Sequence, residues 1–217
     1  MNRFLFAACV LFWATSPNIT HAAVFERDWQ LPGDGLLTYD DLNRREWLDI
    51  PDSLLSQFPG TLLERIDLAI AELEPGGLFE DFTLAKSPDV IALAQSAGID
   101  TGTDDFDVNH DPTEQLISYL SPTLVESNRL WTLGIVKDLV QSDPETCFCH
   151  GDTLIAIDSI VDFAGVRILP GLVPSLDPPG VYSMTGLFLY REVPEPSTLA
   201  LLASAVLFCI LSGQMIR

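Results

Sequence analysis

Residues 111–136, DPTEQLISYLSPTLVESNRLWTLGIV, decide the fold because a helical pattern gives way here to a strand pattern. The stretch begins with Asp111-Pro112-Thr113-Glu114, an acidic cap followed by a proline in the first turn, which predicts a helix over residues 112–120. The apolar and β-branched run at 130–136 then predicts a strand. We therefore expect helices before this stretch and strands within and after it.

Two more helices and two short strands are expected upstream. Apolar residues recur at helical spacing over 62–73, and Pro75-Gly76-Gly77 ends that helix. A serine cap and a proline in the first turn predict a second helix over 87–97, which a glycine ends. Nearer the N-terminus, residues 36–40 and 46–50 have the pattern of two short strands joined by a turn of Asp and Asn.

Downstream, three further apolar and β-branched segments are separated by Gly, Pro and Asp, at residues 154–161, 166–169 and 181–191. We expect them to form one sheet with the strand at 130–136. Early helices together with strands at both ends favour an α+β fold. The prediction is a single domain in which short early helices pack on a mostly antiparallel sheet.

The two ends of the chain differ from its middle. A basic start, ten apolar residues at 4–13 and small residues near position 22 are typical of a secretory signal peptide, so we expect residues 1–22 to be removed. Residues 197–216 carry no charge. As a helix they would measure roughly 30 Å, the thickness of the hydrocarbon core of a bilayer. We expect a transmembrane helix there.

The middle of the chain is strongly acidic. Residues 23–195 hold all 31 acidic residues and nine basic ones, a net charge of −22. Such a polyanion repels nucleic acid and anionic headgroups and attracts multivalent cations and basic surfaces. We therefore exclude nucleic acid as a partner. The acidic residues alternate with apolar segments, which favours a folded domain over a disordered chain.

The chain ends in Val193-Pro194-Glu195-Pro196-Ser197, an apolar span and a terminal Arg217. This order resembles the PEP-CTERM sorting signal of exported proteins from Gram-negative bacteria that make extracellular polysaccharide. The resemblance implies that residues 193–217 are the signal, that 23–192 are the exported domain, and that an exosortase processes the chain near the Pro-Glu-Pro site. Such tails usually carry several Arg residues. Here one Arg stands alone, so retention of the tail by the positive-inside bias is weak.

The leading half also resembles a group of exported bacterial proteins with the same signal. The matching residues are 33–40 (GDGLLTYD), 46–49 (EWLD), Gly76-Gly77, Phe82 and 85–93. The layout is similar to the Lcl C-terminal group of C-type-lectin-like domains, which implies that the last strand, at 182–191, closes against the first. Two departures stand out: Lys86-Ser87-Pro88-Asp89 replaces the expected Thr-x-x-Glu, and the bridging cysteines of many lectin-like domains are missing.

Cys147 and Cys149 are the two cysteines of the exported part, where the compartment is oxidising. A disulfide between them would close a very small ring near the limit of bridging geometry and would be strained. Free or intermolecular thiols are a second alternative. A zinc or copper site with His150 and Asp152 is a third, although structural zinc usually has two spaced pairs of ligands. The sequence leaves all three open.

Carboxylates alternate along residues 100–111 as they do in a calcium-binding loop. The candidate ligands are Asp105, Asp107, Asn109 and Asp111. The first three match an EF-hand, but His110 then occupies the glycine position and Leu116 the position of the terminal Glu. Two alternatives follow, a weak calcium site that is not an EF-hand and a solvated acidic loop that caps the next helix.

Residues suited to catalysis are few in the exported part. Its only histidines are His110 and His150, and no serine lies in a Gly-x-Ser-x-Gly elbow. We expect a non-enzymatic protein whose domain binds polysaccharide, calcium or matrix proteins. It would cross the inner membrane, stay anchored facing the periplasm by its C-terminal helix, and then reach the outer surface or the extracellular matrix.

The alternative function is a secreted hydrolase that uses carboxylates on polysaccharide. A deep cleft with two facing carboxylates would favour the hydrolase, whereas a shallow surface with buried tryptophans would favour a binding or structural protein. Trp47 and Trp131 lie among apolar residues of predicted strands, so we expect both in the core. The environment of Trp29 stays open.

Overall fold

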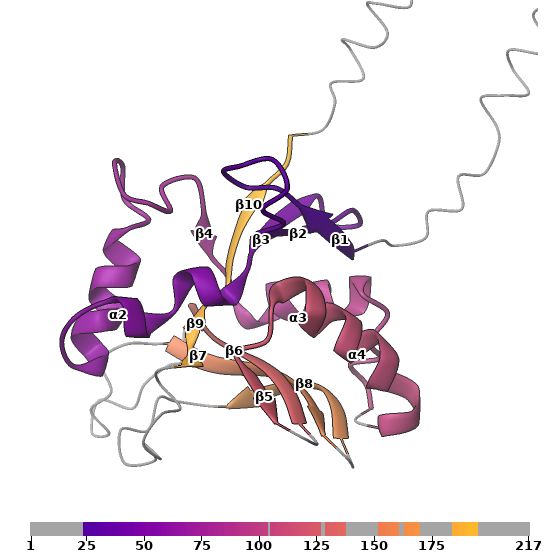
Figure 1. Cartoon of the computed structure of the whole chain (residues 1–217). Helices are drawn as coiled ribbons and strands as arrows, with labels where there is room; N and C mark the ends of the chain where they lie inside the picture. Colours follow the sequence, from indigo (N-terminus) through magenta and orange to yellow (C-terminus); the bar gives the residue numbers. More distant parts are fainter. Residues whose placement is uncertain are drawn as a thin grey trace, which may run out of the picture.

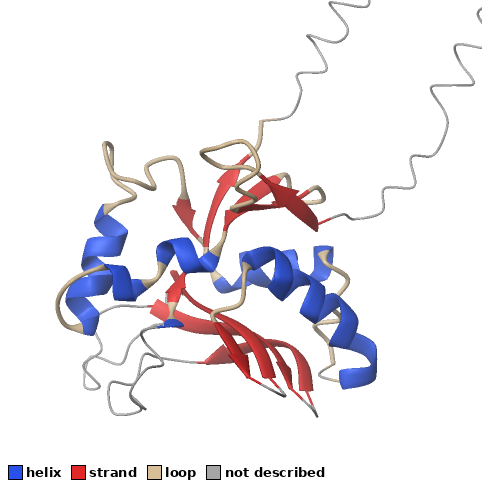
Figure 2. Cartoon of the chain, viewed as in Figure 1, coloured by secondary structure: helices blue, strands red, loops and turns tan. Residues whose placement is uncertain are grey.

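A computed structural model describes residues 24–103, 105–126, 129–137, 152–160, 163–169 and 184–194. The predicted signal peptide, the predicted transmembrane helix and both exported cysteines lie outside these residues. The predicted α+β class is confirmed, since helices and two largely antiparallel sheets make up the described part of the chain (Figures 1 and 2).

The first sheet has five strands in the order β1-β2-β3-β10-β4. Their bounds are β1 Val24–Arg27, β2 Leu37–Asp40, β3 Arg45–Leu48, β10 Leu189–Glu192 and β4 Thr83–Leu84. β10 pairs antiparallel with β3 on one side and with β4 on the other. The last strand therefore lies in the interior of a sheet whose other strands come from the N-terminal half of the chain. The expectation that the last strand closes against the first is wrong, because β1 lies at the far edge and pairs with β2.

The second sheet has the order β5-β6-β7-β8, and β9 pairs in parallel with β6. Their bounds are β5 Leu124–Glu126, β6 Arg129–Lys137, β7 Asp152–Ile160, β8 Phe163–Leu169 and β9 Gly186–Leu187. The prediction that the segments at 130–136, 154–161 and 166–169 share one sheet is confirmed, but the segment at 181–191 divides, giving β9 to this sheet and β10 to the first. The chain crosses between the sheets at Phe188, whose N–H donates to the carbonyl of Ile135 at 3.0 Å and whose carbonyl accepts from the N–H of Ala85 at 2.8 Å.

Three α-helices and two short 3-10 helices complete the described chain. Their bounds are η1 Ile50–Ser53, η2 Leu55–Gln57, α2 Leu62–Ala71, α3 Ser87–Ser96 and α4 Phe106–Leu120. α3 and α4 lie between the two sheets, and α2 lies at the opposite end of the molecule (Figure 1). A capping box of Thr61 and Glu64 starts α2.

Helix α4 begins six residues before the predicted start and contains Pro112 in its interior. A proline at that position removes one backbone hydrogen bond, which is why the sequence favours a start there. The earlier start is stabilised by two side chains. Asp105 caps the helix by accepting from the N–H of Asp107, and Asn109 ties the first turn to the preceding loop.

Two apolar clusters form the core, and each takes side chains from both sheets. The first joins α3 and α4 to Trp47, Ile155 and Phe188. The second packs α2 and Phe79 against Leu48 and Leu133. Because each cluster bridges the sheets, neither sheet has a core of its own.

The prediction for the tryptophans is half confirmed. Trp47 is 1% exposed and belongs to the first cluster. Trp131 is only half-buried, and the guanidinium of Arg129 lies 3.8 Å from its ring centroid. Trp29, left open by the sequence, is half-buried and packs against Phe79 and Phe82.

Candidate functional site

The predicted sorting signal begins directly after β10. In the pair of β3 and β10, Arg191 lies opposite Glu46 and Glu192 opposite Arg45. Val193 continues this pairing, because its N–H donates to the carbonyl of Arg44 at 2.8 Å. The first residue of the predicted signal is thus still part of the sheet.

An open groove of ≈ 600 Å³, which we call the exit groove, lies beside this end. Its wall carries the carboxylates Glu46, Asp81 and Glu192, the cation Arg191, and the backbone of Val193 and Pro194. Of these, Asp81 comes from the turn before β4 and the others from β3 and the C-terminal strand. The groove is therefore assembled from three distant parts of the sequence.

Ion pairs hold the charged groups around the exit groove. Glu46 accepts from Arg27 at 3.0 Å and from Arg191 at 2.8 Å. Arg45 binds Asp89 at 2.8 Å and Glu192 at 3.0 Å. Such partly exposed pairs contribute about 0 to 1 kcal/mol each, so their main effect is to fix the side chains in place.

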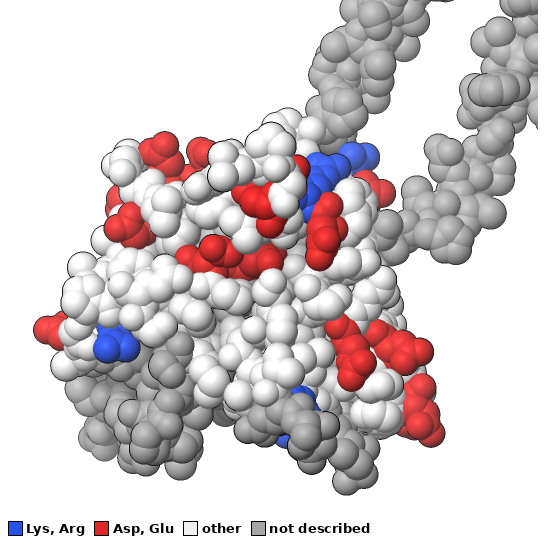
Figure 3. Space-filling model, viewed as in Figure 1, with Lys and Arg blue, Asp and Glu red and all other residues white. Residues whose placement is uncertain are grey.

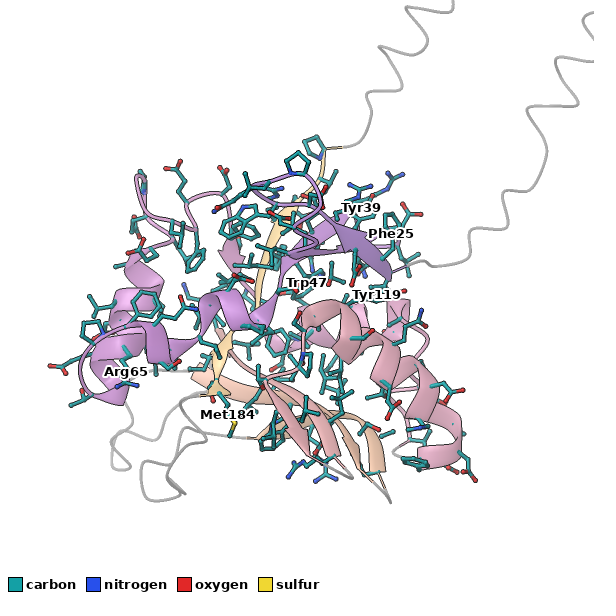
Figure 4. All side chains as sticks on the ribbon, viewed as in Figure 1. Phe25, Tyr39, Trp47, Arg65, Tyr119 and Met184 are labelled. Carbon is teal, nitrogen blue, oxygen red and sulfur yellow. The ribbon has the colours of Figure 1, made fainter. Side chains whose placement is uncertain are left out.

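Aromatic rings pack against the guanidinium groups of two of these arginines. The guanidinium of Arg27 lies 3.6 Å from the ring centroid of Tyr39, and that of Arg45 lies 4.1 Å from the centroid of Tyr190. Phe25 packs edge to face on Tyr39 beside them, as Figure 4 shows. The rings are thereby covered by cations and are not free faces for stacking a sugar. Figure 3 shows basic side chains gathered beside the end of the described chain.

Comparisons of this chain with known protein families, curated proteins and solved structures give no match. Within the described part of the chain, no helix combines the length and the apolar character needed to cross a bilayer. The predicted span at 197–216 lies outside that part.

The calcium candidates lie on α4 and do not converge. Asn109 is fully buried, and its side chain is occupied by three hydrogen bonds to the backbone of Asp100 and Thr103. Asp105, Asp107 and Asp111 are exposed. Among the residues that the structure describes, no group of three or more His, Cys, Asp or Glu is arranged to hold a metal. Calcium binding stays a prediction, which calorimetric titration before and after Asp105→Ala with Asp107→Ala would test.

His110 lies near a serine and a glutamate, but not as a catalytic triad. Its Nδ1 is 3.2 Å from Oγ of Ser159 and 3.7 Å from Oε1 of Glu114. In a triad the base contacts the nucleophile through one ring nitrogen and the orienting acid through the other. Here both contacts use the same nitrogen, and Ser159 is 4% exposed. This geometry does not match that of a catalytic triad.

Sequence reasoning missed Asp49, a carboxylate that is 4% exposed. Its Oδ2 accepts from Oγ of Ser121 at 2.7 Å, while Oδ1 has no hydrogen-bond partner among the described residues. The pKa of Asp49 is raised to about 7: burial is the largest cause, the hydrogen bond from Ser121 opposes it, and nearby carboxylates add to the rise. These carboxylates are Asp52, Glu26 and Asp34. The only sequence signal was an acid between two apolar residues.

Asp49 also joins three elements. It follows β3 and occupies the N-cap position of η1, without a side-chain capping hydrogen bond. Ser121 is the C-cap of α4, with a φ of 58° that few residues other than glycine adopt. The carbonyl of Ser121 in turn accepts from Oγ1 of Thr132 on β6 at 2.9 Å. Two hydrogen bonds through Ser121 thus connect Asp49 beside the first sheet to β6 of the second.

Proposed function

We propose that this chain is an exported protein of the cell surface or extracellular matrix, sorted by a PEP-CTERM signal, whose folded domain has a binding or structural role. One observation supports this above all. The described elements begin at Val24 and end at Glu192, just inside the predicted signal-peptide cleavage and the Pro-Glu-Pro motif. Cuts at the two predicted sites would therefore leave every helix and strand of the described residues intact.

Mass spectrometry of the native protein in cell fractions tests this proposal. We expect mature protein that starts near residue 23 and has lost Arg217 once it reaches the surface fraction. The double variant Glu195→Ala with Pro196→Ala should stay unprocessed in the membrane fraction. Glu192→Ala, a change just upstream of the motif, serves as the matched control and should be processed normally. Intact Arg217 in purified surface material would contradict the proposal.

The geometry gives less support to the hydrolase alternative. A general acid needs a raised pKa and access to its substrate. Asp49 has the raised pKa but is buried, whereas Glu46 in the exit groove is held by two arginines. Trp47, which could otherwise stack on a sugar, is in the core. If the purified domain released reducing ends from polysaccharide and Asp81→Asn abolished this activity, the hydrolase alternative would be favoured.

The binding role rests on the charge of the body. A net charge of −22 over residues 23–195 attracts multivalent cations and basic surfaces. A multivalent cation such as calcium can bridge an acidic domain to the acidic polymers of an extracellular matrix. We therefore expect the purified domain to associate with matrix material in the presence of millimolar calcium, and to be released by a chelator. Association that ignores calcium and salt alike would contradict a charge-based role.

A further inference from the structure

The carboxyl of Asp49 connects the end of α4 to the first sheet. Asp49 directly follows β3, and its Oδ2 accepts from Oγ of Ser121 at 2.7 Å. Ser121 ends α4, and Leu120 beside it is fully buried in the first apolar cluster together with Trp47 of β3. Figure 4 shows Tyr119, in the same last turn of α4, near Trp47. This contact therefore joins two elements that are far apart in the sequence.

The surroundings of this carboxyl do not suit a negative charge. Asp49 is 4% exposed, and its Oδ1 has no hydrogen-bond partner among the described residues. Asp52 on η1, Glu26 on β1 and Asp34 in the loop before β2 all raise its pKa through their charge. From α4 it receives the neutral hydroxyl of Ser121. One hydrogen bond would thus have to offset burial and the repulsion of three like charges if Asp49 were ionised.

Asp34 keeps its own charge through the neutral range. Its carboxylate accepts from the N–H of Leu31 at 2.8 Å and from three further N–H groups at 2.8 to 3.3 Å, those of Trp29, Gln30 and Leu36. These bonds, led by the one from Leu31, lower the pKa of Asp34 to about 2 against a smaller effect of burial. Because Asp34 stays ionised, it is the charge of Asp49 that changes near neutral pH.

Ser121 is the part of the junction that can yield. Its φ of 58° lies in the left-handed region, which strains a residue other than glycine. Its carbonyl accepts from Oγ1 of Thr132 at 2.9 Å, and the N–H of Thr123 donates to the carbonyl of Trp131 at 2.9 Å. The link at 121–123 is therefore held by single contacts, and it could open while α4 and β6 keep their own backbone hydrogen bonds.

We propose that Asp49 and Ser121 form a pH-sensitive junction, which holds the end of α4 against the first sheet while Asp49 is protonated and lets residues 121–123 open locally once Asp49 is ionised. Opening admits water to the carboxylate, which relieves its burial and the repulsion by its neighbours. The pKa of Asp49 is about 7 in the closed junction and near 3.9 once exposed. Opening should therefore increase from about pH 4 and level off above pH 7.

Hydrogen exchange of the full chain in detergent micelles, followed by mass spectrometry, tests the junction. After correction for the intrinsic exchange rate, opening of segment 119–124 should increase about 30-fold from pH 5.5 to pH 8. The segment should also exchange about tenfold or more faster than segment 155–158 of β7, because the opening is local. Asp49→Asn should abolish the increase, whereas the exposed Glu74→Gln, the matched control, should retain it.

A second variant keeps the test decisive if Asp49→Asn fails to fold. Asp52→Asn removes one like charge and so lowers the pKa of Asp49, which should make the increase smaller than in the unsubstituted protein. The far-ultraviolet circular dichroism should be the same at both pH values, since the rest of the fold stays intact. An undiminished increase in either Asp49→Asn or Asp52→Asn would overturn the proposal. So would equal exchange of segments 119–124 and 155–158, or no increase in the unsubstituted protein.

Discussion

At the scale of single residues, Asp49 shows how burial couples stability to pH. Its pKa is about 7 in the folded protein, whereas an unfolded Asp titrates near 3.9. Between those values the unfolded chain binds fewer protons. The contribution of Asp49 to stability is therefore complete below about pH 4 and is lost as the pH rises through 7.

Replacing Asp49 by Asn should remove this dependence. The amide keeps an acceptor for Ser121 and carries no charge. From pH 5 to pH 8, the free energy of unfolding of the unsubstituted protein should therefore fall by about 3 kcal/mol relative to that of Asp49→Asn. Urea unfolding at both pH values measures the difference. Glu74→Gln, the same change at an exposed site, is the control and should follow the unsubstituted protein. Parallel curves for all three proteins would show that Asp49 is not the cause.

Asn109 is a second residue with a structural contribution, which its sequence context alone does not predict. Its three hydrogen bonds fasten the loop at Asp100 and Thr103 to the first turn of α4. Asn109→Ala leaves these backbone groups without their partner and should lower the free energy of unfolding by about 3 kcal/mol. Thermal or urea unfolding checks this, with the exposed Asp111→Ala as control. A loss of similar size in the control would argue against the fastening role.

At the scale of elements, Gly134 permits the two sheets to approach. A Cβ at this position would lie 2.6 Å from a ring carbon of Phe188, the residue at which the chain passes from β9 to β10. Gly134→Ala should therefore shift the ring and destabilise the protein by about 1 to 3 kcal/mol. Chemical unfolding measures this, and the exposed Gly102→Ala should change stability little. Unchanged stability in Gly134→Ala would mean that the crossing tolerates a wider separation.

Helices α2 and α3 could be predicted closely because their signals are local. The predicted ranges 62–73 and 87–97 differ from α2 and α3 by no more than two residues, since capping residues and glycines mark their ends. The segment 181–191 is different. It gives strands to both sheets, and the choice depends on hydrogen bonds of Phe188 to residues far away in sequence. No local pattern carries that information.

The same limit applies to the exit groove. The sequence marks Val193 and Pro194 as the start of a sorting signal, but it does not say that Glu46 and Asp81 lie beside them. That proximity follows from the pairing of β10 with β3 and β4. Long-range register therefore determines the surroundings of the motif, while the motif itself is local.

At the scale of the whole molecule, the two sheets depend on each other. Trp47 of the first sheet shares a cluster with Ile155 of the second, and Leu48 shares the other cluster with Leu133. If one sheet unfolded, both clusters would lose the apolar side chains that this sheet contributes. A body of this size with a shared core is expected to unfold as one cooperative unit.

We therefore predict a single unfolding transition for residues 24–194. Trp47 and Trp131 report on different sheets once Trp29 is replaced by Phe in both variants, so that urea unfolding of Trp131→Phe then follows the first sheet and that of Trp47→Phe the second. After correction for each substitution's effect on overall stability by circular dichroism, fluorescence and circular dichroism midpoints should coincide within each variant. A fluorescence midpoint that departs from the circular dichroism midpoint in either variant would show that one sheet stays folded without the other. The two apolar clusters would then not couple the sheets into one cooperative unit.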